Sequence, residues 1–469
     1  MSSLTENAVG FIDDEKIVSL LETGKNADKQ RANDIVAKAR QANGLELDEL
    51  AVLLQADDPE VLAGIYDAAL HVKNKIYGRR IVFFAPLYVS NVCANNCLYC
   101  GFRKDNKDLV RRVLTPDEIK REIEILLSEG HKRILLVAGE HPTLSGIDYI
   151  EKSVEAVYAV KLGNASIRRV NVNCAPLSVD DFKRLKACGI GTYQCFQETY
   201  HLDTYKVMHP SGPKSDYLWR LLAPSRAMEA GIDDVGVGAL FGLTDYRYEV
   251  MATLMHAQYL DSTYGVGPHT ISVPRLEPAL NAPAANRPPR AVTDDDMRRI
   301  VACFRLAVPY TGIILSTRER AEFRKELIAL GVSQVSAGSR TSPGGYHDAQ
   351  AHKPETEQFS IGDSRSLSEV LYELAEGNYI PSFCTACYRA GRTGEHFMGL
   401  AKHGDIQHMC GPNALLSLKE YLIDYADPQT RAEGERLISE SLAELSPKLR
   451  ARTSELLSKI DQGERDVYV

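Results

Sequence analysis

Apolar residues recur every three or four positions along the first part of the chain and predict helices there. The clearest runs are residues 45–54 and 59–70. This spacing gathers the apolar side chains on one face of a helix. We therefore expect residues 1–78 to form a helical cap that packs against a larger domain.

From residue 79 onward, short β-rich runs alternate with amphipathic helices. In one such unit the sequence TPDE at 115–118 supplies a helix N-cap, a proline at the first helical position and a capping-box carboxylate. Gly130 then ends the helix, and an apolar run at 133–138 follows at once. Ser178 begins another helix in the same way. Alternation of this kind is typical of βα units around a parallel sheet.

The number of these units predicts the fold class. Strands are expected near residues 80–88, 133–138, 168–174, 192–198, 234–240, 270–276, 313–317 and 334–339. Eight strands in alternation with helices predict an α/β protein with a (βα)8 TIM-type barrel over residues 79–345. A doubly wound open sheet is the alternative. Residues 346–469 are expected to form a mostly helical C-terminal domain.

Charge and composition narrow the function. There are 55 Lys and Arg residues against 63 Asp and Glu, a net charge of -8, without a long basic run of the kind that binds nucleic acid or an anionic membrane. Stretches approaching the ~18 apolar residues of a membrane span are missing, and the N-terminus does not resemble a secretion signal. We expect a soluble, cytoplasmic protein that acts on small molecules.

Six of the ten cysteines fall into two sets, and the other four stand singly. In a cytoplasmic chain, thiols or metal ligands are the expected state rather than disulfides. The single cysteines lie among apolar neighbours and are predicted to pack as small hydrophobic residues; they are Cys174, Cys188, Cys195 and Cys303.

The first set consists of Cys93, Cys97 and Cys100 at CxxxCxxC spacing, just after the first predicted strand. Parallel barrels hold their chemistry at this carboxyl end of the strands. Three thiolates do not complete a tetrahedral zinc site, whereas on a cubane iron-sulfur cluster they leave one iron open to another ligand. A zinc site with a remote fourth ligand is the alternative.

The spacing of these cysteines, Tyr99 immediately before the last of them, and their position after strand one resemble the radical S-adenosylmethionine (radical SAM) superfamily. The resemblance implies a 4Fe-4S cluster on the three cysteines. It also implies that S-adenosylmethionine binds the open iron and is cleaved on reduction to a 5′-deoxyadenosyl radical.

The same resemblance implies further contacts to S-adenosylmethionine. Residues 137–140, which include Gly139 and Glu140, are similar to the Gly-Gly-Glu motif of the superfamily. Asn173, Glu198 and Arg220 are candidates for the ribose hydroxyls and the methionyl carboxylate, which suit amide, carboxylate and guanidinium partners. Each could instead be an ordinary polar residue at a strand end.

The second set, Cys384, Cys387 and Cys410, has CxxC spacing followed by a third cysteine. Chemistry alone allows either a second iron-sulfur cluster or structural zinc. Zinc would need a fourth ligand, for which His396, His403 and His408 are the neighbouring candidates.

Residues 191–201 and 265–275, together with this cysteine tail, resemble the tyrosine lyases that mature FeFe-hydrogenase. The resemblance implies cleavage of the tyrosine Cα–Cβ bond to p-cresol and dehydroglycine, and conversion of dehydroglycine to carbon monoxide and cyanide. An auxiliary 4Fe-4S cluster with an extra labile iron and L-cysteine would collect them as an Fe(CO)2(CN)-cysteine synthon. The implied partners are a reductant such as ferredoxin or flavodoxin and other hydrogenase maturases.

Four more residues are candidates for binding the labile iron or the tyrosine substrate. His269 immediately precedes the sixth strand, which puts it at the mouth opposite the first cysteines; it is a candidate iron ligand or merely a strand cap. Arg318 is the first choice to bind the tyrosine carboxylate, with Ser316 and Ser339 as weaker candidates. Alternatively, Arg318 pairs with Glu322 on the surface.

Two other functions remain. The tyrosine lyase family of thiazole synthesis shares the first cluster but releases dehydroglycine and lacks the second cysteine set. A non-catalytic iron-sulfur scaffold would need no S-adenosylmethionine pocket, and the positions of Tyr99, Glu140 and Glu198 argue against it.

Overall fold

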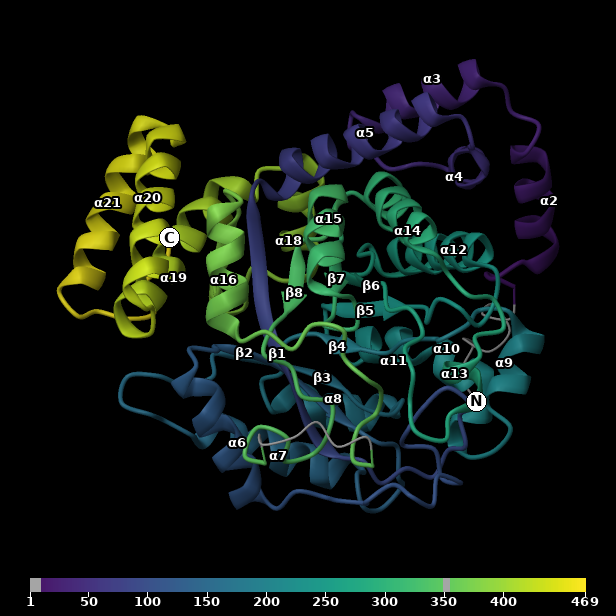
Figure 1. The fold of residues 1–469 in the computed structure, drawn as a ribbon, viewed down its shortest axis with the longest axis horizontal. Coiled ribbons are helices and arrows are strands. Elements are labelled where there is room, and N and C mark those ends of the chain that lie inside the picture. The colour runs from purple at the N-terminus through teal and green to yellow at the C-terminus, as the bar shows by residue number, and fades with distance from the viewer. Residues whose placement is uncertain (1–9, 349–354) are drawn as a thin grey trace.

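The protein is a closed parallel barrel with helices around it, seen in a computed structural model that describes residues 10–348 and 355–469 (Figure 1). Neighbouring strands pair in chain order, and β1 pairs with both β8 and β2, which closes the ring. The barrel strands are β1 Arg80–Ser90, β2 Arg133–Ala138, β3 Arg169–Asn173, β4 Tyr193–Gln194, β5 Val235–Gly238, β6 Thr270–Ser272, β7 Gly312–Leu315 and β8 Gln334–Ser336. The predicted (βα)8 barrel is confirmed, and the open sheet is excluded.

Helices follow the strands and cover the outside of the barrel. They are α6 Pro116–Ser128, α7 Ile147–Ala159, α8 Val179–Ala187, α9 Leu202–Met208, η1 Pro213–Ser215, α10 Tyr217–Leu221, α11 Ala223–Glu229, α12 Tyr246–Tyr264, α13 Pro283–Asn286, α14 Asp294–Ala307 and α15 Ala321–Leu330. As predicted, α6 begins with a reciprocal capping box between Thr115 and Glu118, and Gly130 beyond its end has a φ of 97°. Its buried residues face the barrel, because they recur at helical spacing.

The N-terminal helices are α2 Asp14–Gly24, α3 Lys29–Ala39, α4 Leu47–Gln55 and α5 Pro59–Tyr77. The longest of them, α5, packs against α14 and α15 on the outside of the barrel. The first nine residues of the predicted cap lie outside the described part of the chain. None of the helices in the described ranges is long and apolar enough to cross a membrane.

The C-terminal region contains one strand that the sequence did not predict. It comprises α16 Leu367–Glu376, β9 Ile380–Ser382, α17 Ala386–Arg389, α18 Gly394–His403, α19 Gln407–Asp424, α20 Pro428–Glu444 and α21 Pro447–Asp461. β9 pairs in parallel with residues 80–82 of β1. This strand has only three residues, which is too few to show an alternating pattern. It also contains Pro381, and proline is found in sheets mainly at edge strands.

The strand β1 is therefore shared among three neighbours. Its first residues pair with β9, residues 82–84 pair with β8, and residues 85–90 pair with β2. Because these contacts follow one another along eleven residues, β1 spans the barrel from one mouth to the other. It thereby links the C-terminal region to the end at which the first cysteines lie.

A second link is a segment of turns and bends, residues 355–363, which we call the strap. Its backbone bonds to the loops at the carboxyl mouth of the barrel: Gly101 N donates to Gln358 O at 2.9 Å, and Gly362 N donates to Thr317 O at 2.8 Å. A Cβ atom on Gly101 would lie 2.6 Å from Glu357 O, so only glycine permits this close approach.

Three of the four single cysteines are buried as predicted, namely Cys174, Cys195 and Cys303. Cys188 is only half-buried, because it caps the end of α8, where that helix meets solvent. Its side chain still packs against the hydrophobic core, so the prediction of packed side chains is confirmed for all four cysteines.

Arg305 of α14 provides a test of how the barrel is held together. This fully buried guanidinium donates to the carbonyls of Pro309, Thr311 and Gly331, which flank β7 and β8. Arg305→Met should lower the free energy of unfolding by on the order of 3 kcal/mol, because three buried carbonyls lose their donor. Urea denaturation followed by circular dichroism measures the loss.

The matched control is Arg298→Met on the same helix, whose ion pairs with Asp295 and Glu326 lie near the surface. It should cost less than about 1 kcal/mol. Equal denaturation midpoints for the two variants would show that the buried guanidinium has no special role.

Candidate functional site

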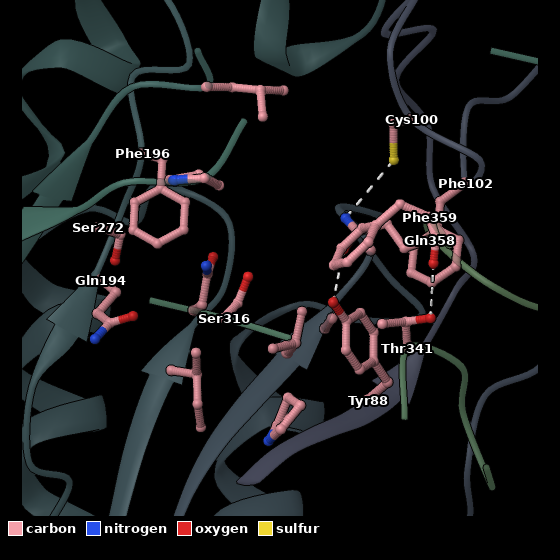
Figure 2. A pocket seen from close by; sticks show the side chains of 18 of the residues that line it. Tyr88, Cys100, Phe102, Gln194, Phe196, Ser272, Ser316, Thr341, Gln358 and Phe359 are labelled. Atoms are coloured by element: carbon pink, nitrogen blue, oxygen red, sulfur yellow. Dashed lines mark hydrogen bonds between the residues drawn. The ribbon is translucent and has the colours of Figure 1, made fainter. Parts of the chain in front are cut away.

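A cavity of about 200 Å³ opens at the carboxyl ends of the barrel strands and continues into the barrel (Figure 2). It brings together every barrel residue that the sequence singled out, apart from His269. Those lining it are Cys93, Cys97, Tyr99, Cys100, Gly139, Glu140, Asn173, Glu198, Arg220, Ser316, Arg318 and Ser339. Residues separated by more than 200 positions in the sequence thus face one space.

The loop that carries the first cysteines is held by Asn95 and Glu140. Ala94 N donates to Glu140 O at 2.7 Å, and Asn95 Nδ2 donates to the Glu140 carboxylate at 2.8 Å. Gly139 lies against the loop so closely that a Cβ atom there would be 2.6 Å from Val92 O. The predicted glycine and glutamate of residues 137–140 therefore position the cysteine loop as well as line the cavity.

Burial governs the state of the three thiols. It raises the pKa of Cys97 to about 12 and that of Cys100 to about 11. The thiols are therefore protonated in the absence of metal, and metal binding must displace their protons. In the described ranges, no three His, Cys, Asp or Glu side chains converge as ligands of a single ion. Three sulfur donors on one short loop beside an open cavity fit a cluster with one uncommitted position.

Glu198 lies at the centre of a buried charge network. Its Oε1 is 2.6 Å from Lys214 Nζ and 3.7 Å from Arg220 Nη2. Burial alone raises the pKa of Glu198, but the charges of Lys214 and Arg220 outweigh this effect and hold the pKa below its usual value. Glu198 also has a φ of 72°, an uncommon backbone conformation for a residue with a side chain. The surrounding structure thus fixes an ionised carboxylate at the cavity wall.

Lys214, which was not predicted from the sequence, also lines the cavity, and its backbone N–H donates to Asn95 Oδ1 at 2.8 Å. It lies in the three-residue 3-10 helix η1, which has no recognisable motif, so the sequence carried no signal for it. Tyr99, which was predicted, has its hydroxyl 2.7 Å from His209 Nε2. This contact fixes the ring beside the cysteines.

Arg318 lies in the loop after β7 and faces the cavity. Its guanidinium carbon is 3.3 Å from the centre of the Phe359 ring on the strap. The alternative ion pair with Glu322 is not formed among the described residues. Ser316 Oγ accepts from Arg318 N at 3.4 Å, and Ser339 Oγ is buried without a protein partner in the described part of the chain. The cavity therefore offers the Arg318 guanidinium and the unsatisfied Ser339 hydroxyl to a guest.

The second cysteine set lies at the opposite mouth. Cys384 follows β9, and its carbonyl accepts from Arg133 Nη2 at the start of β2 at 2.9 Å. Cys387 lies in α17 and Cys410 in α19. A hydrogen bond with Cys410 lowers the pKa of Cys387 to about 6, with help from the nearby Arg80. The same hydrogen bond, together with burial, raises the pKa of Cys410, and burial raises that of Cys384. Cys387 is therefore the thiol of this set that most readily gives up its proton to a metal centre.

His269 lies at the same mouth, as predicted. Its Nε2 is 3.0 Å from the Tyr388 hydroxyl, in the helix that carries Cys387, and its Nδ1 is 3.5 Å from Asp234 Oδ1. Burial lowers the pKa of His269 to about 4, so the ring is neutral near pH 7, the form that binds metals. Of the other histidines considered, His396 and His408 are exposed, and the side chain of His403 is outside the described part.

Two family models match the chain. Residues 87–256 match the radical SAM superfamily, and residues 272–380 match the biotin and thiamin synthesis associated domain. The first region covers the cysteine loop, Glu140, Asn173, Glu198 and Arg220.

Individual relatives cover more of the chain. A 2-iminoacetate synthase of Salmonella typhimurium is 35% identical over 341 residues, 72% of this chain and 87% of the relative. The crystal structure of a HydG, a maturase of the FeFe-hydrogenase, is 52% identical with a TM-score of 0.95, covering 98% of this chain and all of that one. The HydG structure from Carboxydothermus hydrogenoformans is 40% identical with a TM-score of 0.84, covering 97% and 100%. The chain therefore belongs to the radical SAM superfamily and, within it, to the HydG family of hydrogenase maturases.

Proposed function

We propose that the protein cleaves L-tyrosine at the carboxyl mouth of its barrel and builds an iron complex from the fragments at the amino mouth. One observation carries this proposal: a single barrel has three cysteines at each end, and a cavity that begins at one end enters its interior. Radical SAM membership means that the protein uses S-adenosylmethionine and a 4Fe-4S cluster. We assign that cluster to Cys93, Cys97 and Cys100.

When bound, the first cluster supplies an electron and an open iron for S-adenosylmethionine, which yields a 5′-deoxyadenosyl radical. The role of the chain is to hold the cosubstrate. Asn173 and Glu198 offer acceptors to the ribose hydroxyls, and the Arg220 guanidinium suits the methionyl carboxylate. Lys214 keeps Glu198 ionised and fixed, so that its carboxylate meets the guest without rearranging.

Arg318 binds the carboxylate of tyrosine in this proposal, while Ser316 and Ser339 offer hydroxyl groups to its polar atoms. The strap lies over this part of the cavity, where Phe359 stacks on Arg318. Exclusion of water matters here, because it prevents a reactive radical from being quenched by side reactions.

The proposed products account for all atoms of the substrate. Breaking the Cα–Cβ bond divides tyrosine into p-cresol and dehydroglycine, and dehydroglycine contains the atoms of carbon monoxide, hydrogen cyanide and water. The name of the 2-iminoacetate synthase relative describes the same two-carbon imine as its product. This similarity supports the first step, and the whole-chain similarity to HydG structures supports the second.

Buried polar atoms line the barrel interior between the two mouths. Gln194 and Ser272 line the cavity on the side away from Cys100, as Figure 2 shows. Gln194 Oε1 and Thr270 Oγ1 are both buried without a protein partner among the described residues. Buried polar atoms of this kind are normally satisfied by water or a guest. We propose that small polar fragments cross here towards His269.

At the amino mouth, Cys384, Cys387 and Cys410 hold an auxiliary 4Fe-4S cluster in this proposal. His269 and L-cysteine would bind an extra labile iron there, on which carbon monoxide and cyanide collect as the Fe(CO)2(CN)-cysteine synthon. The neighbouring Arg80 and Arg133 balance the negative charge that thiolates bring into a buried site. The partners proposed are a ferredoxin- or flavodoxin-type reductant and the other hydrogenase maturases.

A thiazole-type lyase, which would release dehydroglycine as its final product, is the second candidate, favoured by the 2-iminoacetate synthase similarity over 72% of the chain. That function gives no role to the second cysteine set. A scaffold protein would need no cavity such as the one lined by Glu198 and Arg318.

Removing the two cysteine sets separately tests the proposal. The protein is reconstituted with iron and sulfide without oxygen, then supplied with S-adenosylmethionine, tyrosine, cysteine and a low-potential reductant. Cys97→Ala should abolish both p-cresol and carbon monoxide, because radical formation is lost. Cys384→Ala combined with Cys387→Ala should retain p-cresol and lose carbon monoxide. Chromatography measures p-cresol, and binding to haemoglobin measures carbon monoxide.

If the unaltered, well-loaded protein makes p-cresol without carbon monoxide, the thiazole-type function replaces ours. If it makes neither product, tyrosine is not the substrate. Equal loss of both products in the two variants would contradict the proposal that tyrosine is cleaved at one mouth and the iron complex is built at the other.

His269→Ala should leave p-cresol formation within about twofold of normal and remove the labile iron, because only the amino mouth loses a ligand. Iron analysis of the loaded protein and infrared detection of iron-bound carbon monoxide report the loss. His396→Ala, an exposed histidine on the neighbouring α18, is the matched control and should behave normally. A variant at 269 that kept all its iron would refute the ligand role.

Arg318→Ala should raise the Michaelis constant for tyrosine at least about tenfold, since a charge-assisted hydrogen bond to the carboxylate is lost. The Michaelis constant for S-adenosylmethionine should not change. Arg320→Ala, two residues along, removes an exposed arginine paired with Asp294 and serves as control. Unchanged tyrosine kinetics in Arg318→Ala would remove Arg318 from the substrate site.

A further inference from the structure

The strap contributes a side chain to the first cysteine set. Gln358 Nε2 donates to Cys100 Sγ at 3.7 Å, and Gln358 Oε1 accepts from the Tyr88 hydroxyl at 2.7 Å (Figure 2). Donors to sulfur lie farther from their acceptor than donors to oxygen do, because sulfur is larger. The amide of Gln358 therefore bridges β1 and the cysteine loop.

Tyr88 determines which way this amide points. The buried Tyr88 hydroxyl lies 2.7 Å from Gln358 Oε1 and donates to it. A hydroxyl that donates must face the amide oxygen, and this turns the amide NH2 group towards Cys100. The hydrogen bond to Tyr88 thus holds the Gln358 NH2 group in position to donate to the Cys100 sulfur.

The backbone beneath the amide is also fixed on both sides. Gln358 N donates to Thr341 O at 3.0 Å, and Gln358 O accepts from Gly101 N at 2.9 Å. The next residue, Phe359, is buried, and its ring lies against Arg318. A side chain anchored at its backbone and at its far end is held in one geometry, which a lasting hydrogen bond to a sulfur requires.

We propose that Gln358 is a positioning residue that raises the reduction potential of the cluster held by Cys93, Cys97 and Cys100. Reduction adds negative charge, part of which resides on the cysteine sulfurs. An N–H donor stabilises the reduced form more than the oxidised form, and such hydrogen bonds are among the determinants of iron-sulfur potentials. The cluster receives its electron whichever substrate is cleaved, so this role of Gln358 does not depend on the proposed cleavage of tyrosine.

Redox titration of the reconstituted protein, followed by electron paramagnetic resonance without S-adenosylmethionine or tyrosine, tests this role. Gln358→Leu should lower the ratio of reduced to oxidised first cluster about fivefold at a fixed potential, the effect of losing one hydrogen bond. Tyr88→Phe should lower the ratio by a smaller factor, because the Gln358 amide remains but no longer has the Tyr88 hydroxyl to orient it. Ser360→Ala, an exposed position on the strap, is the matched control and should cause no shift.

The proposed auxiliary cluster in the same sample acts as an internal reference, and its reduction potential should not change. A second readout is the set of exchangeable deuterons coupled to the reduced cluster in heavy water. Gln358→Leu should remove one of these couplings and leave those of the backbone N–H groups of Asn95, Phe102 and Glu140, which also bond to Cys93 and Cys100. If Gln358→Leu fails to load, the potential of Tyr88→Phe still decides the question, and an unchanged value there would overturn the proposal. An unchanged potential in a loaded Gln358→Leu protein, or a loaded Gln358→Leu protein that keeps every deuteron coupling, would also overturn it. Because these measurements detect no product, a failed tyrosine assay leaves them unaffected.

Discussion

The closed ladder of parallel hydrogen bonds around β1 is the constraint on which the rest of the structure depends. β1 runs through the barrel wall and pairs with β9 at one end, with β8 in the middle and with β2 at the other end. The first cysteines leave its carboxyl end, and Cys384 leaves the end of β9 beside its start. The separation of the two cysteine sets therefore follows from the length of a single strand. A functional division between the two mouths needs this rigidity, because a loop alone would not hold the sites apart.

Buried charge is the second feature that organises the molecule, and both mouths concentrate it. At the carboxyl mouth, Glu198 is matched by Lys214 and Arg220. At the amino mouth, Arg169 meets Asp234 at 3.7 Å, while Arg80 and Arg133 have buried nitrogen atoms without a partner among the described residues. Unpaired buried guanidinium groups are costly, and an anionic guest offsets that cost. The excess of positive charge at the amino mouth is consistent with thiolate-rich cofactor binding there.

The strap connects parts of the chain that differ in role. Gln358 reaches the cysteine loop, and Phe359 reaches Arg318, so adjacent residues contact the proposed electron-accepting and substrate-binding groups. Since its backbone bonds to the loops that follow β1, β6, β7 and β8, the strap also closes the cavity on one side. In a radical enzyme, such a cover restricts both water and stray hydrogen donors.

The sequence by itself determined the elements whose signals are local. All eight barrel strands, the capping box at Thr115 and the cysteine spacing were readable, because strand periodicity, helix caps and a ligand motif each depend on residues near one another in the chain. The position of His269 at the amino mouth also followed, since strand direction in a parallel barrel is fixed by chain order.

Only the tertiary structure decided the contacts between distant segments. Lys214 meets Glu198, Gln358 meets Cys100, and β9 joins β1 across about 300 residues, none of which leaves a periodic or local trace. The partial exposure of Cys188 likewise depended on where α8 ends relative to solvent. The physical reason is that local propensity selects helices and strands, whereas the pairing of charges, sulfur atoms and strand edges is selected by the packing of the whole chain.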